Sequence, residues 1–111
     1  MSASLLALSR PTFTSYSVAD ISTRYLTESD GRLLADGETF PIVGIILDGA
    51  GALLVVPDPD DEGRAESISE AGWSAEMMAI LRELHQQGFE YVRFDNNGFE
   101  ITGGEFPTFN W

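Results

Sequence analysis

The sequence predicts a single α+β domain, a two-layer sandwich in which two helices cover one face of a mostly antiparallel sheet of about four to five strands. Three observations lead to this fold class: two apolar runs flank the turn sequence "DGAG", a helical stripe of apolar residues follows, and an alternating segment comes near the end. The chain of 111 residues is long enough for one core and too short for two. We expect the order β-α-β-β-α-β-β, with residues 1–11 as a flexible N-terminus.

The first strand and the first helix are expected in the N-terminal part. Residues 13–21 combine β-branched and aromatic side chains in partial alternation, which is typical of a strand. Thr27 is a candidate N-cap for a short helix, because its hydroxyl accepts a hydrogen bond from a first-turn N–H and acidic residues follow it. Gly37 is expected to end that helix.

A hairpin of two well-buried strands is expected next. The apolar runs Ile42–Leu47 and Ala52–Val56 flank "DGAG", and Pro57 closes the second strand because it has no N–H to donate. Residues 58–72 are acidic and poor in apolar side chains, so this segment is expected to be a solvated loop or a loosely ordered excursion.

The clearest element is a helix that Ser74 caps and Gly88 ends in a left-handed conformation. Its apolar positions recur with helical spacing and form one stripe. They are Met77, Ile80, Leu81 and Leu84. Residues 89–94 then alternate as a strand, "DNNG" turns the chain with Asn97–Gly98 suited to positive φ, and residues 99–102 are expected to return as its partner.

The charge of the chain limits its partners. The formal net charge is −12, with 18 acidic residues against six basic ones, all of them arginine. A field of this sign repels phosphate backbones, so direct nucleic-acid binding is disfavoured, while a basic protein surface is attracted. The absence of cysteine excludes disulfides, thiolate catalysis and cysteine zinc sites.

No membrane or secretory segment is expected. The N-terminal "MSASLLALSR" has no basic region before its short apolar run, and no apolar run approaches the length of a membrane span. The expected location is the cytoplasm.

Catalytic, cofactor and metal sites are not expected. His85 is the only histidine and lies in the last turn of the strong helix, and no nucleophile-elbow pattern is present. The segment "DPDDEG" places carboxylates at alternate positions, like the opening of a calcium loop. However, the twelfth position is Ser69 where such a loop carries a glutamate.

The candidate partner-binding residues are the acids of residues 58–70, which concentrate negative charge in a segment with few competing roles. They are Asp58, Asp60, Asp61, Glu62, Glu66 and Glu70. Two interpretations stay open: a solvated loop, or an anionic surface that occupies a basic groove meant for nucleic acid. The second needs carboxylates splayed outward over a firm surface.

The last seven residues, "EFPTFNW", are the most apolar part of the C-terminal region. Pro107 fixes a bend, and the aromatic side chains of Phe106, Phe109 and Trp111 are then able to cover an apolar face. We expect this tail to be part of the core rather than a docking motif.

Three short motifs, in this order, resemble a known family. Ser22 and Thr23 follow the first strand, "YVRFDNNG" lies near the end, and "FPTFNW" closes the chain. The series is similar to a family of short bacterial proteins from plasmids, phages and other mobile elements, the domain of unknown function 5983. The similarity covers about residues 15 to 111. In the family a histidine stands where this chain has Tyr25, which argues further against catalysis.

The resemblance implies no reaction, but it implies a genetic neighbourhood that often carries anti-defence genes. The expected function is therefore a non-enzymatic, acidic, nucleic-acid-mimicking protein that inhibits a host defence nucleoprotein of restriction or CRISPR type. One alternative is a small ligand-binding domain or enzyme with a cleft near Ser22, Thr23, Tyr25 and Asp95. Another is an accessory domain whose acidity serves solubility only.

Overall fold

The computed structural model describes residues 10–47 and 51–110, including every side chain in these ranges except that of Glu62. Four strands form one sheet in the order β1-β4-β3-β2. Their bounds are β1 (Val18–Ser22), β4 (Tyr91–Asp95), β3 (Gly51–Val55) and β2 (Gly44–Leu47). Strands β1 and β4 are parallel, and the other two pairs are antiparallel.

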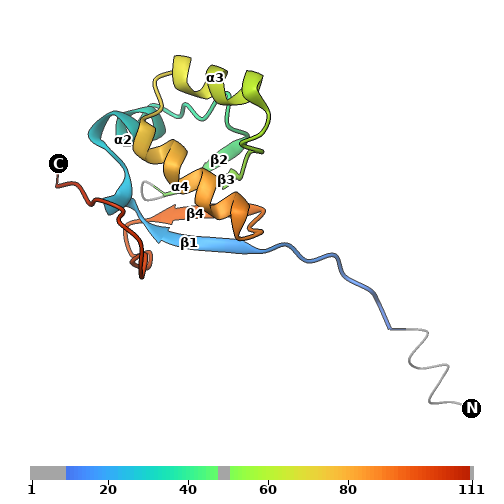
Figure 1. Cartoon of the computed structure of the whole chain (residues 1–111). Coiled ribbons are helices and arrows are strands. Elements are labelled where there is room, and N and C mark those ends of the chain that lie inside the picture. Colours follow the sequence, from blue (N-terminus) through green and yellow to red (C-terminus); the bar gives the residue numbers. More distant parts are fainter. Residues whose placement is uncertain (1–9, 48–50, 111) are drawn as a thin grey trace, which may run out of the picture.

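The described helices lie on one side of this sheet (Figure 1). They are the 3-10 helix η1 (Thr23–Tyr25) and the α-helices α2 (Glu28–Ala35), α3 (Glu62–Glu70) and α4 (Ala75–Gln86). The predicted fold class is confirmed: the chain is an α+β two-layer domain with a mostly antiparallel sheet.

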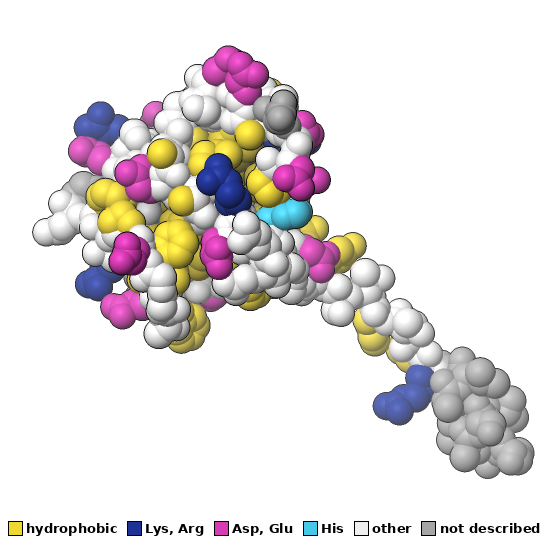
Figure 2. Space-filling view, viewed as in Figure 1, with side chains coloured by type: hydrophobic (Ala, Val, Ile, Leu, Met, Phe, Trp, Pro, Cys, Tyr) yellow, Lys and Arg dark blue, Asp and Glu magenta, His cyan; other side chains and the backbone are white. Residues whose placement is uncertain are grey.

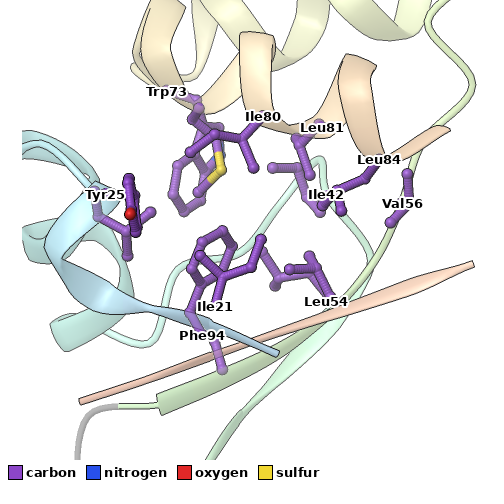
Figure 3. Packing of buried hydrophobic residues seen from close by; sticks show 14 of the residues in the cluster. Ile21, Tyr25, Ile42, Leu54, Val56, Trp73, Ile80, Leu81, Leu84 and Phe94 are labelled. Atoms are coloured by element: carbon purple, nitrogen blue, oxygen red, sulfur yellow. The ribbon is translucent and has the colours of Figure 1, made fainter. Parts of the chain in front are cut away.

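The core lies between the sheet and α4, as Figure 3 shows. The apolar stripe predicted for the strong helix is buried throughout. The sheet contributes Leu54, Val92 and Phe94, each 0% exposed. Alternate residues of a strand point to opposite faces, so Val92 and Phe94 both face the helices while Arg93 between them is exposed.

The caps predicted from sequence are present. The side chain of Thr27 accepts from the N–H of Asp30, and the carboxylate of Asp30 accepts from the N–H of Thr27, which completes a capping box at the start of α2. Ser74 caps α4 by accepting from the N–H of Met77. Gly37 (φ 78°) and Gly88 (φ 84°) follow the two helices in the left-handed conformation.

The prediction of a final strand over residues 99–102 is wrong. These residues form no strand in the described structure. The reason is that β4 is already paired on both sides, with β1 and β3, so no edge of β4 is left for a returning strand.

The turn after β4 also differs from the prediction, because Gly98 does not have a positive φ. A glycine is needed at position 98 for another reason, which is the close approach of this residue to the backbone of β1. A Cβ added to Gly98 would lie 2.5 Å from the carbonyl carbon and oxygen of Ile21. The chain therefore passes tightly over the end of β1, where the Phe99 carbonyl accepts from the N–H of Ser22 at 3.0 Å.

The prediction of two well-buried hairpin strands is half wrong. The strands pair as expected, while the residues of the predicted turn, 48–50, lie outside the described residues. Strand β3 is buried, but β2 is not, since Ile45 is 57% exposed and Ile46 is 39% exposed. The cause is position: β2 forms an edge of the sheet.

The C-terminal tail lies against the domain as far as Asn110, the last described residue. Phe106 is half-buried and packs against the core, as expected for a tail that covers an apolar face. The N–H of Phe109 donates to the carbonyl of Arg24 at 2.8 Å. Trp111 is outside the described residues.

Candidate functional site

Most of the acidic segment, Glu62–Glu70, is a helix, so the expectation of a loop over residues 58–72 is wrong for these residues. The side chain of Asp61 caps α3 by accepting from the N–H of Arg64 at 3.2 Å. Upstream, the carboxylate of Asp58 accepts from the N–H of Asp60 at 2.9 Å and forms a turn before the cap. One apolar side chain, Ile68 (0% exposed), fixes the helix to the core.

That anchor explains why the sequence pattern concealed the helix. A surface helix usually shows a stripe of apolar residues, whereas α3 has Ile68 and the small Ala65 on its inner side. These two residues, together with Met78 and Leu81 of α4, line a small void between the helices. The Asp61 cap was a usable signal, because aspartate is among the preferred N-cap residues.

Five of the six predicted partner-binding residues fall into two groups, and the side chain of the sixth, Glu62, lies outside the described part of the structure. Asp58 and Asp61 have structural partners: Asp58 lies 3.8 Å from His85 Nε2, and Asp61 caps α3 and lies 3.8 Å from Arg64 Nε. Asp60, Glu66 and Glu70 are exposed, and none of them has an ion pair within the described part of the chain.

Glu66 and Glu70 stand one helical turn apart on α3, so their side chains share one side of the helix. Figure 2 shows carboxylates at the end of the molecule formed by α3, with others scattered over the α4 side. The structure thus brings the acids onto a firm surface, which a flexible loop would not supply.

Neighbouring carboxylates already engage most of the cations of the chain. Among the described residues, four of the six arginines have an ion pair within 4 Å. The pairs are Arg24–Glu100, Arg32–Glu28, Arg64–Asp61 and Arg93 with both Asp20 and Asp95. These are surface pairs and add little stability. Their consequence is that the excess negative charge resides on the remaining acids, including those of α3.

The charge density of α3 is lower than that of duplex DNA. Glutamates four residues apart stand about 6 Å apart along a helix axis. Duplex DNA carries about one charge per 1.7 Å of axis. The stripe on α3 therefore has less than about a third of that density. It matches a short region of a basic groove rather than a full DNA footprint.

The residues of the alternative site near Ser22 take part in hydrogen bonds within the domain. Ser22 is buried and accepts from the N–H of Arg24, and the Thr23 hydroxyl donates to Asn96 at 2.8 Å. The Tyr25 hydroxyl accepts from the N–H of Ile101 at 2.9 Å. The Asp95 carboxylate bonds to Arg93 and to the N–H of Asn97.

Two members of this set, Thr23 and Tyr25, line separate hollows. Thr23 lines a shallow one of about 250 Å³ beside Asn96 and Phe109. Tyr25 lines a different one, of about 220 Å³, between α4 and the tail. No group of three or more histidine and acidic side chains among the described residues is arranged to hold a metal ion.

Sequence reasoning missed Asp30, the fully buried carboxylate that joins two helices. Besides its capping box, Asp30 accepts from the N–H of Ser74 at 2.9 Å and from the Ser74 hydroxyl. It thereby fixes the start of α4 to the start of α2. The position of Thr27 three residues before an acid indicated the helix cap. It did not indicate the contact between Asp30 and Ser74, which lie 44 residues apart in the sequence.

Sequence reasoning also missed a cleft of about 590 Å³ between α3 and the segment that leads into β2. The apolar side of the cleft includes Phe40, Val43 and Gly44, and the helical side includes Asp61, Arg64 and Ser67. No local pattern marks this cleft, because its two walls are separated in sequence.

The described residues define an α+β domain with an acidic helix. The chain matches the model of the C-terminal domain of a family of unknown function, DUF5983, over residues 18–111. It belongs to that family. No curated protein and no solved structure shows significant similarity to it. Within the described ranges, no helix combines the length and the apolar character needed to cross a membrane.

Proposed function

We propose that the chain is a non-enzymatic binding protein whose acidic surface occupies a basic, nucleic-acid-binding groove of another protein. The observation that carries this proposal is the capped helix α3, which presents Glu66 and Glu70 exposed and without ion pairs among the described residues. A helix holds its charges in place before binding, so less conformational freedom is lost than with a loop.

The partner we propose is a host defence complex of restriction or CRISPR type. Such a complex holds nucleic acid in a positively charged channel, and a protein with a net charge of −12 is attracted to that channel. The choice of defence complexes comes from the mobile-element proteins that the sequence motifs resemble. The charge argument itself requires only a basic groove.

The test is a competition assay with matched charge variants. Purified restriction and CRISPR complexes bind a fluorescent DNA duplex, and the chain is added as competitor while anisotropy is recorded. The variant Glu66→Gln/Glu70→Gln removes two charges from α3, and Glu90→Gln/Glu105→Gln removes two exposed charges elsewhere. Both double variants have the same net charge, −12 + 2 = −10.

The expected result is that the chain displaces DNA from at least one complex and that the α3 variant weakens displacement about tenfold, or about 1.4 kcal/mol. The control variant is expected to stay close to the parent chain. Displacement is also expected to weaken steeply between about 50 mM and 200 mM salt. Equal losses in the two variants would show that only net charge matters and would remove α3 from the proposal.

A further inference from the structure

Strand β2 has a free hydrogen-bonding edge. The N–H of Val55 donates to the carbonyl of Val43 at 2.7 Å, and these residues are direct partners in the extended register of the hairpin. Hydrogen-bonded and non-bonded pairs alternate along an antiparallel ladder. The N–H and C=O groups of Gly44 and Ile46 therefore point away from β3. Among the described residues, no group outside the sheet hydrogen-bonds to either of them.

This edge lacks the features that usually protect an edge strand. Natural proteins place lysine, proline or inward-pointing charges on such edges, or cover them with other segments. Strand β2 has the sequence "GIIL" and contains none of these residues. The exposed fractions of the apolar side chains on and before it are large: Phe40 79%, Val43 60%, Ile45 57% and Ile46 39%. Val43 and Ile45 alternate with Gly44 and Ile46, so these two exposed apolar side chains lie on the open face of the sheet.

The large cleft opens beside the start of this edge. Its strand side contains Val43 and Gly44, and its helical side is the face of α3 that includes Asp61, Arg64 and Ser67. Gly44 allows β2 to lie close to β3, since a Cβ added there would lie 2.5 Å from the side chain of Leu54. A strand placed next to β2 would point every second side chain toward the helical side of the sheet, and near Gly44 that side is this cleft.

The lining of the cleft holds one acid and one base, Asp61 and Arg64, and further acids stand close to it along the chain. Arg64 is the one cation among the lining residues, and it lies 3.8 Å from Asp61 Oδ2. Glu70 stands three residues after Ser67 on α3, on the same side of the helix, and Glu38 directly precedes the lining residue Thr39. Because the chain as a whole has a net charge of −12, an added strand with basic side chains is favoured over one with acidic side chains.

We propose that β2 binds an extended partner segment as a fifth strand, with alternating apolar and basic residues. The backbone of the segment pairs with Gly44 and Ile46, its apolar side chains lie beside Val43 and Ile45 on the open face, and its Arg or Lys side chains face α3. In this binding mode backbone hydrogen bonds supply affinity and alternate side chains supply specificity. The proposal rests on the proposed function, because both require a basic partner, and it names how that partner is held.

Charge disfavours a second copy of the chain as the occupant. Each copy has a net charge of −12, and like charges brought together oppose association. A basic segment gains attraction from the same field. The test below nevertheless includes self-association as an outcome that overturns the proposal.

The experiment uses a capped synthetic peptide of alternating valine and arginine as the probe, with a valine–glutamate peptide for comparison. Amide shifts of the isotope-labelled full chain report where each peptide binds. Ile46→Pro removes one outward N–H without touching the β3 ladder, a position where an edge strand tolerates proline. Ile46→Thr is the matched control, since it changes the side chain and keeps the N–H. Thermal unfolding verifies that both variants fold.

The expected result is binding of the valine–arginine peptide alone, with shifts at Gly44–Leu47 and α3. Ile46→Pro is expected to weaken binding at least about tenfold, while Ile46→Thr stays within about threefold of the parent. Equal binding by the two variants, no detectable binding, or equal binding of both peptides overturns the proposal. So does a dimer in sedimentation equilibrium that Ile46→Pro dissociates.

The outcomes also separate this proposal from the proposed function. In one outcome, Ile46→Pro changes neither peptide binding nor DNA displacement, while Glu66→Gln/Glu70→Gln weakens both. This outcome overturns strand addition and leaves the acidic helix as the binding surface. Peptide binding that requires the Ile46 N–H, together with no DNA displacement, retains the edge site and overturns the nucleic-acid groove as its target.

Discussion

The two edge strands of the sheet differ in how well the apolar character of their sequence matches their burial. Strand β2 reads "GIIL" and is largely exposed, whereas β1 reads "VADIS" and ends in two buried residues, Ile21 (5% exposed) and Ser22 (4% exposed). The less apolar strand is thus the better covered one at its end. The difference arises because the segment that follows β4 passes over the end of β1.

The β1 side is closed by several long-range contacts. Gly98 passes over the backbone of Ile21, and the tail bonds to Arg24. Asp30 joins α2 to the start of α4. The β2 side has the cleft and an unpaired edge instead. Hydropathy alone therefore does not decide which strand is buried, because an edge needs a covering segment as well as apolar side chains.

The largest effect is expected on the closed side, from Asp30→Ala. The change leaves the N–H groups of Thr27 and Ser74 without their acceptor at two helix starts. Unsatisfied buried donors cost about 1–3 kcal/mol each, so we expect about 3 kcal/mol of destabilisation in urea unfolding. Asp36→Ala, at the exposed end of α2, is the control and should change stability by less than about 0.5 kcal/mol. Similar losses in both variants would contradict the role given to Asp30.

An intermediate effect is expected from Phe106→Ala in the tail. Phe106 is half-buried against the core, so its truncation should cost about 1–2 kcal/mol, less than the value for a fully buried phenylalanine. The corresponding fall in Tm is roughly 4–15 °C. Phe99→Ala removes a ring that is 72% exposed and serves as the comparison. A Tm unchanged by Phe106→Ala would mean that the tail does not contribute to the core.

The smallest effect is expected on the open side, from Ile45→Thr. Ile45 and Ile21 are the same residue type in opposite edge strands, with exposed fractions of 57% and 5%. We expect Ile45→Thr to change the free energy of unfolding by less than about 0.5 kcal/mol and Ile21→Thr to lower it by about 2 kcal/mol. Chemical denaturation of both variants measures the contrast. Equal losses would show that β2 is covered in solution.

Local patterns were sufficient for part of the fold. The stripe from Met77 to Leu84 fixed the buried face of α4, since helical spacing places these residues on one side. The caps Thr27 and Ser74 and the left-handed glycines were also predictable, because each depends on a single turn of chain. The domain class followed from the order of such elements.

The residues of the candidate site were predictable from the sequence, but the secondary structure that presents them was not. The acids of residues 58–70 were evident, but the helix that presents them depends on one buried residue, Ile68, and on α4 as its support. The cleft and the free edge of β2 were not predictable. They arise from the order of the strands in the sheet, which no local period encodes.

By itself, the sequence determined the charge, the α+β class, the strongest helix and its caps, because these depend on composition and on neighbours within a few residues. Only the tertiary structure decided that β4 is central, that β2 is an open edge and that the acids of α3 stand on a firm surface. Each of these depends on contacts between distant segments. These contacts are stabilised by apolar surface buried between two segments and by hydrogen bonds between two strands, so no single segment encodes them.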